Sequence, residues 1–307
     1  MPYVPVQART PEDWPQTAEQ RWRAIRQAQP DLAPAIDLQR RLLTLVVGLA
    51  DALKGGRLPR LSLPPGYLAA KLARGVPALA GEPVPLPVAV LTRVLLQLCT
   101  ALGEGGAGEA ADHIRQAIAT GSLDAGSLLS ASFARDQSSI RTGAGQRGLA
   151  PDLVWLVAEL AVSPYVNALQ RLLLTAAVDP RLRSTLEAWN RGYCPACGSW
   201  PAVAEVVGGH RLLRCSFCAS AWELSAYACI YCEQGGDGFL TAAPDAERKD
   251  RRLEVCSACH GYLKSIDIEG LSPFPLAAIS DIETTDLDVA AMERGYRRPA
   301  LKPFTRR

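Results

Sequence analysis

The first two thirds of the chain follow a helical pattern of apolar and polar positions. In residues 37–54, leucine and valine recur at intervals of three and four residues, and Gly55-Gly56 then follows in the manner of a helix C-cap. The same reasoning predicts further helices over residues 14–29, 67–73, 88–102, 109–120, 127–134, 152–175 with a kink at Pro164, and 181–189. No strand is predicted before Asn190, so this part is expected to be helical throughout.

After Asn190 the pattern changes to short alternating runs. Residues 202–207 and 210–214 flank Gly208-Gly209, which predicts a β-hairpin. Further short strands are predicted over residues 222–228, 239–242, 253–255 and 262–268. Apolar side chains are few for so many strands, so burial alone would not offset the chain entropy lost on folding. Another source of cohesion is therefore expected here.

Length and charge limit the possible classes of function. A chain of 307 residues is expected to form about two domains. Its 33 basic and 31 acidic residues give a formal charge of +2, so no broad electrostatic field would hold a nucleic-acid backbone or an anionic membrane. We therefore expect no nucleic-acid partner.

The sequence predicts neither a secretory signal nor a membrane span. The first nine residues lack the charged, apolar and small-residue pattern of a signal peptide. The longest apolar runs are interrupted by Asp51, Arg93 and Glu159, so none reaches the roughly 18 to 20 apolar residues that a bilayer span needs. We expect a cytoplasmic protein whose apolar helices form a core.

Cysteine is concentrated in one part of the chain. Of the nine cysteines, only Cys99 lies before Cys194, and the other eight form four Cys-x-x-Cys pairs. Without a secretory signal, such clustering indicates metal ligation before disulfides. Two intervening residues let both sulfurs of a tight turn face one ion while backbone N–H groups point at the sulfurs. The predicted ligands are Cys194, Cys197, Cys215, Cys218, Cys229, Cys232, Cys256 and Cys259.

The intervals between the pairs predict two sites of four thiolates. Seventeen residues separate Cys197 from Cys215, and 23 separate Cys232 from Cys256. The predicted hairpin after Cys197 favours sequential pairing, although an interleaved pairing would also use all eight thiolates. Disulfides or thioredoxin-like redox pairs are the alternatives, and no parallel βαβ pattern supports the latter.

A four-cysteine site has no open coordination position, so the metal is expected to be structural or electron-accepting rather than hydrolytic. Zinc and iron both accept four thiolates in a tetrahedron.

The other residues that could bind a metal are weaker candidates than the eight cysteines. His210 and His260 flank the cysteines and are expected beside the metal or at the surface, without binding it, while His113 is expected at the surface and Cys99 in the core.

Three further features have an ordinary interpretation. Gly143, Gly145 and Gly148 resemble a phosphate-binding loop, but no strand precedes them, so a flexible connection is predicted. The charged run at residues 248–252 is expected to be a solvated loop, with contact to an acidic face of a partner as the alternative. The aromatic residues among the cysteines are expected to pack over the metal sites; they are Trp200, Phe217, Trp222, Tyr227 and Tyr231.

Four segments around the cysteines have a recognisable pattern: Cys194-Pro195-Ala196-Cys197-Gly198-Ser199-Trp200-Pro201, Arg214-Cys215-Ser216-Phe217-Cys218 with Trp222, Cys229-Ile230-Tyr231-Cys232-Glu233, and Cys256-Ser257-Ala258-Cys259-His260-Gly261-Tyr262-Leu263-Lys264. Together they resemble the formate dehydrogenase accessory protein E family. Asp286-Leu287-Asp288 and Glu293-Arg294-Gly295-Tyr296 add to the resemblance, which covers about residues 191–298. The chain differs at Ala219 and His260, where glycine is usual in the family.

The resemblance implies a multidomain fold, α plus small β. An all-helical N-terminal domain over residues 1–190 would precede tandem rubredoxin-like (zinc-ribbon-like) modules over residues 191–228 and 229–307. It implies no enzyme, but a cytoplasmic accessory and assembly factor that binds the catalytic subunit of respiratory formate dehydrogenase before export. It also favours iron over zinc for the two metal ions, and it leaves the oligomeric state open. The alternatives are an iron-containing redox protein or electron carrier, and a zinc-ribbon nucleic-acid binder.

Overall fold

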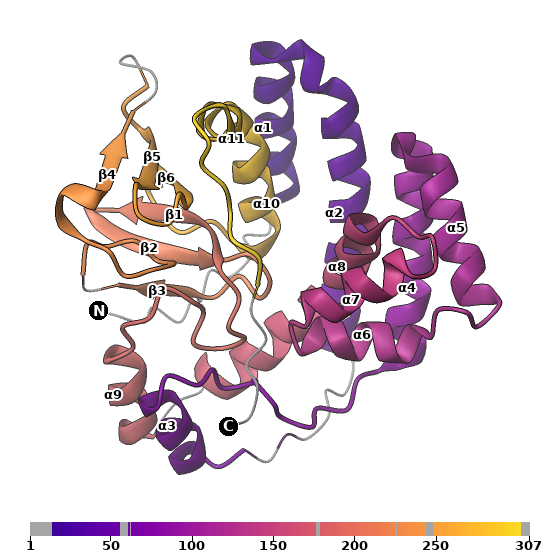
Figure 1. The fold of residues 1–307 in the computed structure, drawn as a ribbon, viewed down its shortest axis with the longest axis horizontal. Helices are drawn as coiled ribbons and strands as arrows, with labels where there is room; N and C mark the ends of the chain where they lie inside the picture. The colour runs from indigo at the N-terminus through magenta and orange to yellow at the C-terminus, as the bar shows by residue number, and fades with distance from the viewer. Residues whose placement is uncertain are drawn as a thin grey trace. The chain divides into compact units, whose positions relative to one another are not determined.

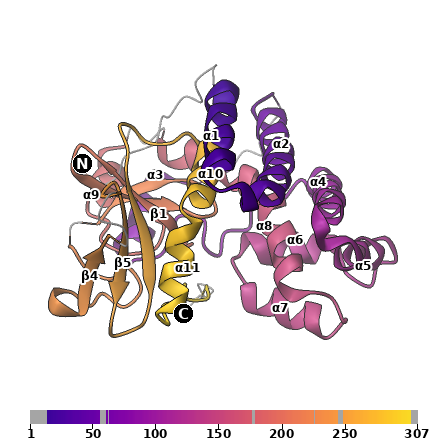
Figure 2. The same cartoon turned by 90° about the horizontal axis from the view of Figure 1, so that it is seen from above.

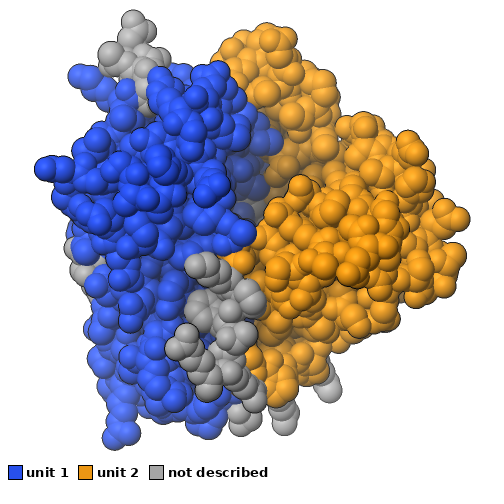
Figure 3. Space-filling view, viewed as in Figure 1, with its two compact units in different colours: residues 1–19, 63–80, 170–300 blue, residues 20–62, 81–169, 301–307 orange. Residues whose placement is uncertain are grey.

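The computed structural model describes residues 14–55, 61, 63–175, 179–224, 226–243 and 248–301. They fall into two compact units (Figures 1 and 3). One unit contains residues 63–80 and 170–300 and holds all eight clustered cysteines. The other contains residues 20–62 and 81–169 and is helical. We call them the cysteine unit and the helical unit.

The helical unit is built as the apolar spacing predicts. Along α4, Leu91, Leu95 and Leu98 are completely buried on one face, and this helix packs against α2, α5 and α6. The predicted helices are confirmed to within a few residues, although Gly56 of the predicted C-cap lies outside the described residues. The helices are α1 (Trp14–Ala28), α2 (Ala33–Gly55), α4 (Val88–Leu102), α5 (Gly108–Ala119), α6 (Ala125–Phe133), α7 (Gln137–Gly145) and α8 (Pro151–Gln170), with α1 beginning in the cysteine unit.

The glycines at residues 143–148 do not form the flexible connection predicted for them. Gly143 and Gly145 lie in α7, which begins where the Asp136 carboxylate accepts a hydrogen bond of 3.1 Å from the backbone N–H of Ser139. Gly148 follows the helix with a left-handed φ of 67°. The helix was missed because glycine is a poor helix former, and here packing of Ile140 and Ala144 overrides that preference.

Two helical stretches have the length and composition of a membrane span, Val88–Ala119 and Pro151–Leu174. Both provide core side chains, such as Leu95 in the first and Val157 and Ala161 in the second, all fully buried. The first is also interrupted at Gly106, whose φ of 109° breaks the helix between α4 and α5. In the part of the chain that the structure describes, both stretches serve as core helices.

The cysteine unit is organised around a mixed six-stranded sheet with the strand order β3-β2-β1-β6-β5-β4. Neighbouring strands are antiparallel except β1 and β6, which pair in parallel from Val203 with Lys264 to Val206 with Asp267. The parallel pair joins two three-stranded halves into one sheet. The strands are β1 (Pro201–Val207), β2 (His210–Cys215), β3 (Ala221–Glu223), β4 (Phe239–Ala242), β5 (Arg251–Cys256) and β6 (Tyr262–Asp267).

The predicted strand over residues 222–228 is shorter than expected, because β3 ends at Glu223. Four helices of this unit accompany the sheet: α3 (Pro65–Ala73), α9 (Pro180–Glu187), α10 (Phe274–Glu283) and α11 (Thr285–Glu293). The last two were not predicted. They lie beside the strands in Figures 1 and 2, and α11 contacts β5 and β6. The apolar part of this contact includes Leu253, Tyr262, Leu287 and Ala291.

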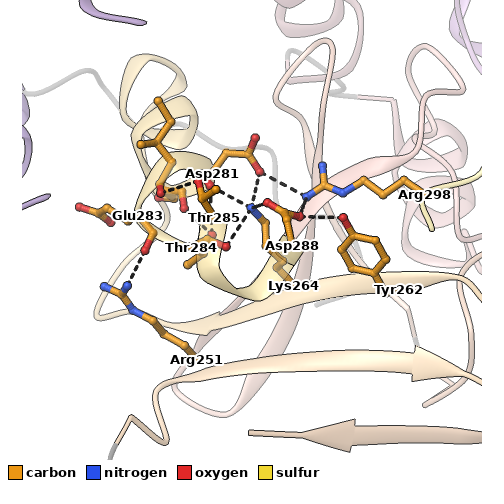
Figure 4. A network of polar contacts seen from close by, with 11 residues as sticks. Arg251, Tyr262, Lys264, Asp281, Glu283, Thr284, Thr285, Asp288 and Arg298 are labelled. Atoms are coloured by element: carbon orange, nitrogen blue, oxygen red, sulfur yellow. Dashed lines mark hydrogen bonds and ion pairs between the residues drawn. The ribbon is translucent and has the colours of Figure 1, made fainter. Parts of the chain in front are cut away.

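A buried polar network attaches α10 and α11 to β6 (Figure 4). The Lys264 ammonium is fully buried and lies 2.7 Å from carboxylate oxygens of both Asp281 and Asp288. It also donates to the backbone carbonyl of Asp281 at 2.9 Å. Arg298 pairs with the same two carboxylates at 3.3 and 3.0 Å, and the Tyr262 hydroxyl donates to Asp288 at 2.8 Å. Burial of the Lys264 charge is tolerable here because two carboxylates pair with it, while Asp281 itself is 46% exposed.

Candidate metal centres

The first four-cysteine group, made by Cys194, Cys197, Cys215 and Cys218, is completely enclosed. All four side chains are buried, and their Sγ atoms lie within 4.8 Å of one another. The Sγ atoms of Cys194 and Cys218 are 3.5 Å apart, and those of Cys197 and Cys215 are 3.4 Å apart. Backbone N–H groups point at these sulfurs, from Ala196 to Cys194 and from Phe217 to Cys215, each at 3.4 Å.

The second group is made by Cys229, Cys232, Cys256 and Cys259 and is partly open. Sγ separations are 3.6 Å between Cys229 and Cys259 and 3.6 Å between Cys232 and Cys256. Cys229 and Cys256 are buried, but Cys232 is exposed and Cys259 is half-buried. Phe239 packs beside the two buried cysteines, with Tyr231 against the same cluster. The two groups establish sequential pairing of the Cys-x-x-Cys turns, which the spacing had favoured without excluding an interleaved pairing.

The four turns share one backbone design. In each, the N–H of the first cysteine donates to the carbonyl five residues later at 2.9 to 3.0 Å, as from Cys194 to Ser199 and from Cys256 to Gly261. The residue after the second cysteine is always left-handed. Its φ is 82° at Gly198, 56° at Ala219, 63° at Glu233 and 54° at His260. Sequence reasoning noted Ala219 and His260, where glycine is usual in the family that the chain resembles, and missed Glu233.

The arrangement of sulfurs fits a metal ion. A tetrahedral ion with metal–sulfur bonds of about 2.3 Å separates its ligands by roughly 3.8 Å, close to the separations found here. The same separations are too long for a disulfide, whose sulfurs lie about 2.05 Å apart. Burial raises the pKa of Cys194 and Cys218 well above the usual range, so their thiolates need a nearby cation. Each group can therefore bind one metal ion.

A segment from the first half of the chain supports the first group. The backbone N–H groups of Ala78 and Leu79 donate to the carbonyls of Pro195 and Ala196 at 2.8 and 2.9 Å. Buried Lys71 of α3 holds this segment by donating to the carbonyls of Ala78 and Ala80 at 3.0 and 2.6 Å. Nothing in the sequence pattern connects residues 71–80 with cysteines more than a hundred positions later, and sequence reasoning missed this support.

The two groups also contact each other through residues adjacent to their cysteines. The rings of Trp200 and Tyr231 meet edge to face with centroids 5.1 Å apart. Gly192 is buried against Ile230, which lies between Cys229 and Cys232; a Cβ on Gly192 would lie 1.9 Å from the Ile230 carbonyl oxygen. The Tyr231 hydroxyl donates to the Tyr262 carbonyl at 3.0 Å. The two sites therefore belong to one packed structure.

The remaining candidate residues lie outside both groups. His210 is exposed and contacts Glu223 at 3.1 Å, while His113 and His260 are also exposed. Cys99 is buried in α4, and burial raises its pKa to about 11, as expected of a core thiol. Of the predicted aromatic residues, Phe217 and Trp222 are fully buried, whereas Tyr227 is 56% exposed.

The charged run at residues 248–252 makes contacts within the chain. Arg248 pairs with Asp286 at 2.6 Å, and Arg251 donates to the Glu283 carbonyl at 2.6 Å. Arg252 forms a close ion pair with Asp267. Residues 248–250 are exposed and precede β5, as the predicted solvated loop requires, while Arg251 and Arg252 belong to β5, and three arginines of the run contact β6, α10 and α11.

Several curated proteins are similar in sequence to part of this chain. No family model matches the chain. It is 31% identical over 138 residues to "Protein FdhE homolog" of Aquifex aeolicus, a match covering 43% of this chain and 47% of that protein. It is 34% identical over 119 residues to "Protein FdhE" of Escherichia coli, covering 38% of each. The chain thus spans less than half the length of these curated relatives.

The fold has a counterpart among solved structures. The crystal structure of the FdhE protein from Pseudomonas aeruginosa aligns with a TM-score of 0.57 at 22% identity, covering 93% of both chains. The structural likeness extends over the helices and the cysteine unit alike, whereas the sequence matches are partial. Over part of its length the chain is therefore similar to FdhE proteins, and it shares the fold of the solved FdhE structure.

Proposed function

We propose that this chain is an accessory factor required to form active respiratory formate dehydrogenase. In this proposal it binds the catalytic subunit of that enzyme in the cytoplasm, before export. The observation that carries the proposal is the presence of two complete four-cysteine groups in a chain that is similar to FdhE proteins. Support for the partner comes from the family resemblance.

The four-cysteine groups support a binding role rather than catalysis. Four thiolates complete a tetrahedral coordination sphere, so neither proposed metal has an open position for a substrate. The metals would instead hold together the turns that flank the strands, because coordination adds free energy to the folded state. We assign no reaction to the chain. Iron is the metal favoured by the resemblance, and zinc is the alternative.

An exposed surface beside the second group is our candidate for partner binding. Tyr227 and Leu240 are 56% and 57% exposed, and the Tyr227 ring packs on Phe239, which contacts the second cysteine group. Exposed large apolar side chains are common at protein interfaces, especially tyrosine. We define these two residues, together with exposed Cys232, as the Tyr227 surface.

Deletion and capture experiments test the proposal. A clean deletion strain without a second copy should lose respiratory formate oxidation while still transcribing the dehydrogenase genes. The purified full chain should capture the catalytic subunit, and the double variant Tyr227→Ser/Leu240→Ser should capture it at least about tenfold less well. Met292→Ser is the matched control, because Met292 is 58% exposed on α11 in the same unit. Normal formate oxidation in the deletion strain would refute the proposal.

A redox role is the second candidate, and one observation favours it. The edge-to-face contact of Trp200 with Tyr231 places aromatic rings between the two cysteine groups, which would shorten an electron path between two iron ions. A visible absorption spectrum of anaerobically purified chain distinguishes the candidates, because iron bound to four thiolates absorbs visible light and zinc does not. A colourless protein containing two zinc ions would exclude the redox candidate.

A further inference from the structure

We infer that the two metal sites are not equivalent: the first retains its ion, and the second exchanges its ion by ligand substitution at Cys232. The inference rests on the proposed binding of one metal ion by each group, and it deepens that proposal by giving the two sites different roles. It follows from three independent observations, namely exposure of the ligands, hydrogen bonds to the sulfurs, and the backbone that covers each site.

Exposure differs sharply between the groups. In the first, Cys194 and Cys218 have no exposed surface and Cys197 and Cys215 are 5% exposed. In the second, Cys232 is exposed. A closed four-ligand site loses its ion only when an incoming donor approaches a ligand or a ligand dissociates. Among the eight ligands, only Cys232 of the second site is an exposed residue that such a donor can approach.

Serine hydroxyls contact the sulfurs of the first group, and none does so in the second among the residues that the structure describes. Ser199 Oγ lies 3.4 Å from Cys197 Sγ, and Ser220 Oγ lies 3.1 Å from Cys218 Sγ. Both serines are buried and stand two residues after a cysteine. When the sulfur is a thiolate ligand, the hydroxyl is the donor, and this bond stabilises the negative sulfur in its metal-binding position.

The corresponding positions in the second group carry Gln234 and Gly261. The Gln234 side-chain amide donates to the carbonyl of Gly235 at 3.1 Å, and Gly261 has no side chain to donate. The two groups can be compared directly because their four turns share one backbone conformation. Among the described residues, hydroxyls contact the sulfurs of the first group only.

The chain segments that lie beside the two cysteine groups also differ. The turn between Cys194 and Cys197 is covered by residues 78–79, whose N–H groups bind its carbonyls. The turn that ends at Cys232 is followed instead by exposed Glu233, Gln234 and Gly236. Gly192 packs against the second turn at Ile230, but the residues that follow Cys232 leave that ligand open to solvent, whereas the first group has no exposed ligand.

The exchange step is an ordinary ligand substitution without oxidation or reduction. An incoming thiol forms a metal–sulfur bond and gives up its proton, while the bond from the metal to Cys232 breaks and the Cys232 sulfur takes a proton. Thiols are the matching class of ligand because they are as soft as the cysteine that they replace. A chelator with nitrogen donors can then remove the ion completely.

Release of Zn²⁺ from the full-length chain tests the inference. Chain loaded with Zn²⁺ to two ions is mixed with glutathione and the chromogenic chelator 4-(2-pyridylazo)resorcinol. We expect two phases of equal amplitude, the faster at least about tenfold quicker than the slower, since hydrogen bonds to a charged group differ between the sites. A pulse of N-ethylmaleimide followed by mass spectrometry should label Cys232 first and the cysteines of the first group last.

A double variant assigns the slow phase. Ser199→Ala/Ser220→Ala should accelerate the slow phase by about tenfold or more and leave the fast phase unchanged. Ser216→Ala is the matched control, because Ser216 lies in the turn between Cys215 and Cys218 with an exposed side chain. Release of both ions in one phase, or equal labelling of both groups, would overturn the inference while leaving metal binding intact. A chain that cannot be loaded beyond one ion would overturn both.

Discussion

Replacing Gly192 by alanine should disrupt the second metal site although the substitution is next to the first. Gly192 is two residues before Cys194, and a Cβ at this position would lie 1.9 Å from the Ile230 carbonyl oxygen and 2.6 Å from its carbonyl carbon. Real Cβ atoms essentially never approach closer than 3.0 Å, so the backbone must shift by about an ångström. Ile230 lies directly between the ligands Cys229 and Cys232, and this shift would displace their sulfurs.

The free-energy cost of the Gly192→Ala substitution depends on which atoms must move. Overpacking a core with one methyl group costs about 1 to 3 kcal/mol where side chains can adjust, and more where they cannot. Here the obstacle is backbone held within a metal-binding turn, so we expect about 3 kcal/mol or more. The expected result is a chain purified with about one metal ion instead of two, and a lower unfolding temperature.

Metal analysis and thermal unfolding are the assays, and Gly48→Ala is the matched control. Gly48 lies in α2, and no atom lies within 4 Å of the position that an alanine Cβ would occupy, so alanine there should stabilise the helix by about 1 kcal/mol. Two bound ions and an unchanged unfolding temperature in the Gly192→Ala variant would refute the packing argument, because they would mean that the two turns are not in contact.

Three other predictions concern the rest of the cysteine unit. The Lys264→Met substitution should leave Arg298 as the cation paired with Asp281 and Asp288 and should lower the free energy of unfolding by about 3 kcal/mol. Hydrogen exchange in α10 and α11 should become faster, and unchanged exchange there would contradict this prediction. Ala219→Gly should raise the unfolding temperature by relieving a φ of 56°, a gain of about 1 kcal/mol, and a lower temperature would count against left-handed strain. Burial opposes ionisation of Asp281, but Lys264 and Arg298 outweigh it and lower its pKa. Its contribution to stability should therefore be complete above about pH 4 and be lost as the pH falls further, a loss seen as faster exchange in α10 that the Lys264→Met variant should lack.

The sequence by itself determined the metal-binding turns and most of the helices. A Cys-x-x-Cys turn depends on residues a few positions apart, so spacing alone predicts that its two sulfurs point the same way. The helices of the helical unit were likewise predictable, because a repeated apolar stripe such as that of α4 is a local property. The hairpin of β1 and β2 followed from Gly208-Gly209 for the same reason.

Other features were decided only by tertiary structure, because they depend on contacts between distant residues. Parallel pairing of β1 with β6 joins strands about sixty positions apart, and no local signal specifies it. Helix α11 buries only Leu287 and Ala291, too few positions for a periodic signal, and is held by charges that meet Lys264. The sequence shows that serines follow the cysteines of the first group and that Cys232 is a cysteine. It does not show that these serines contact the sulfurs or that Cys232 is exposed. Whether a thiolate is enclosed or open depends on what the rest of the chain places over it.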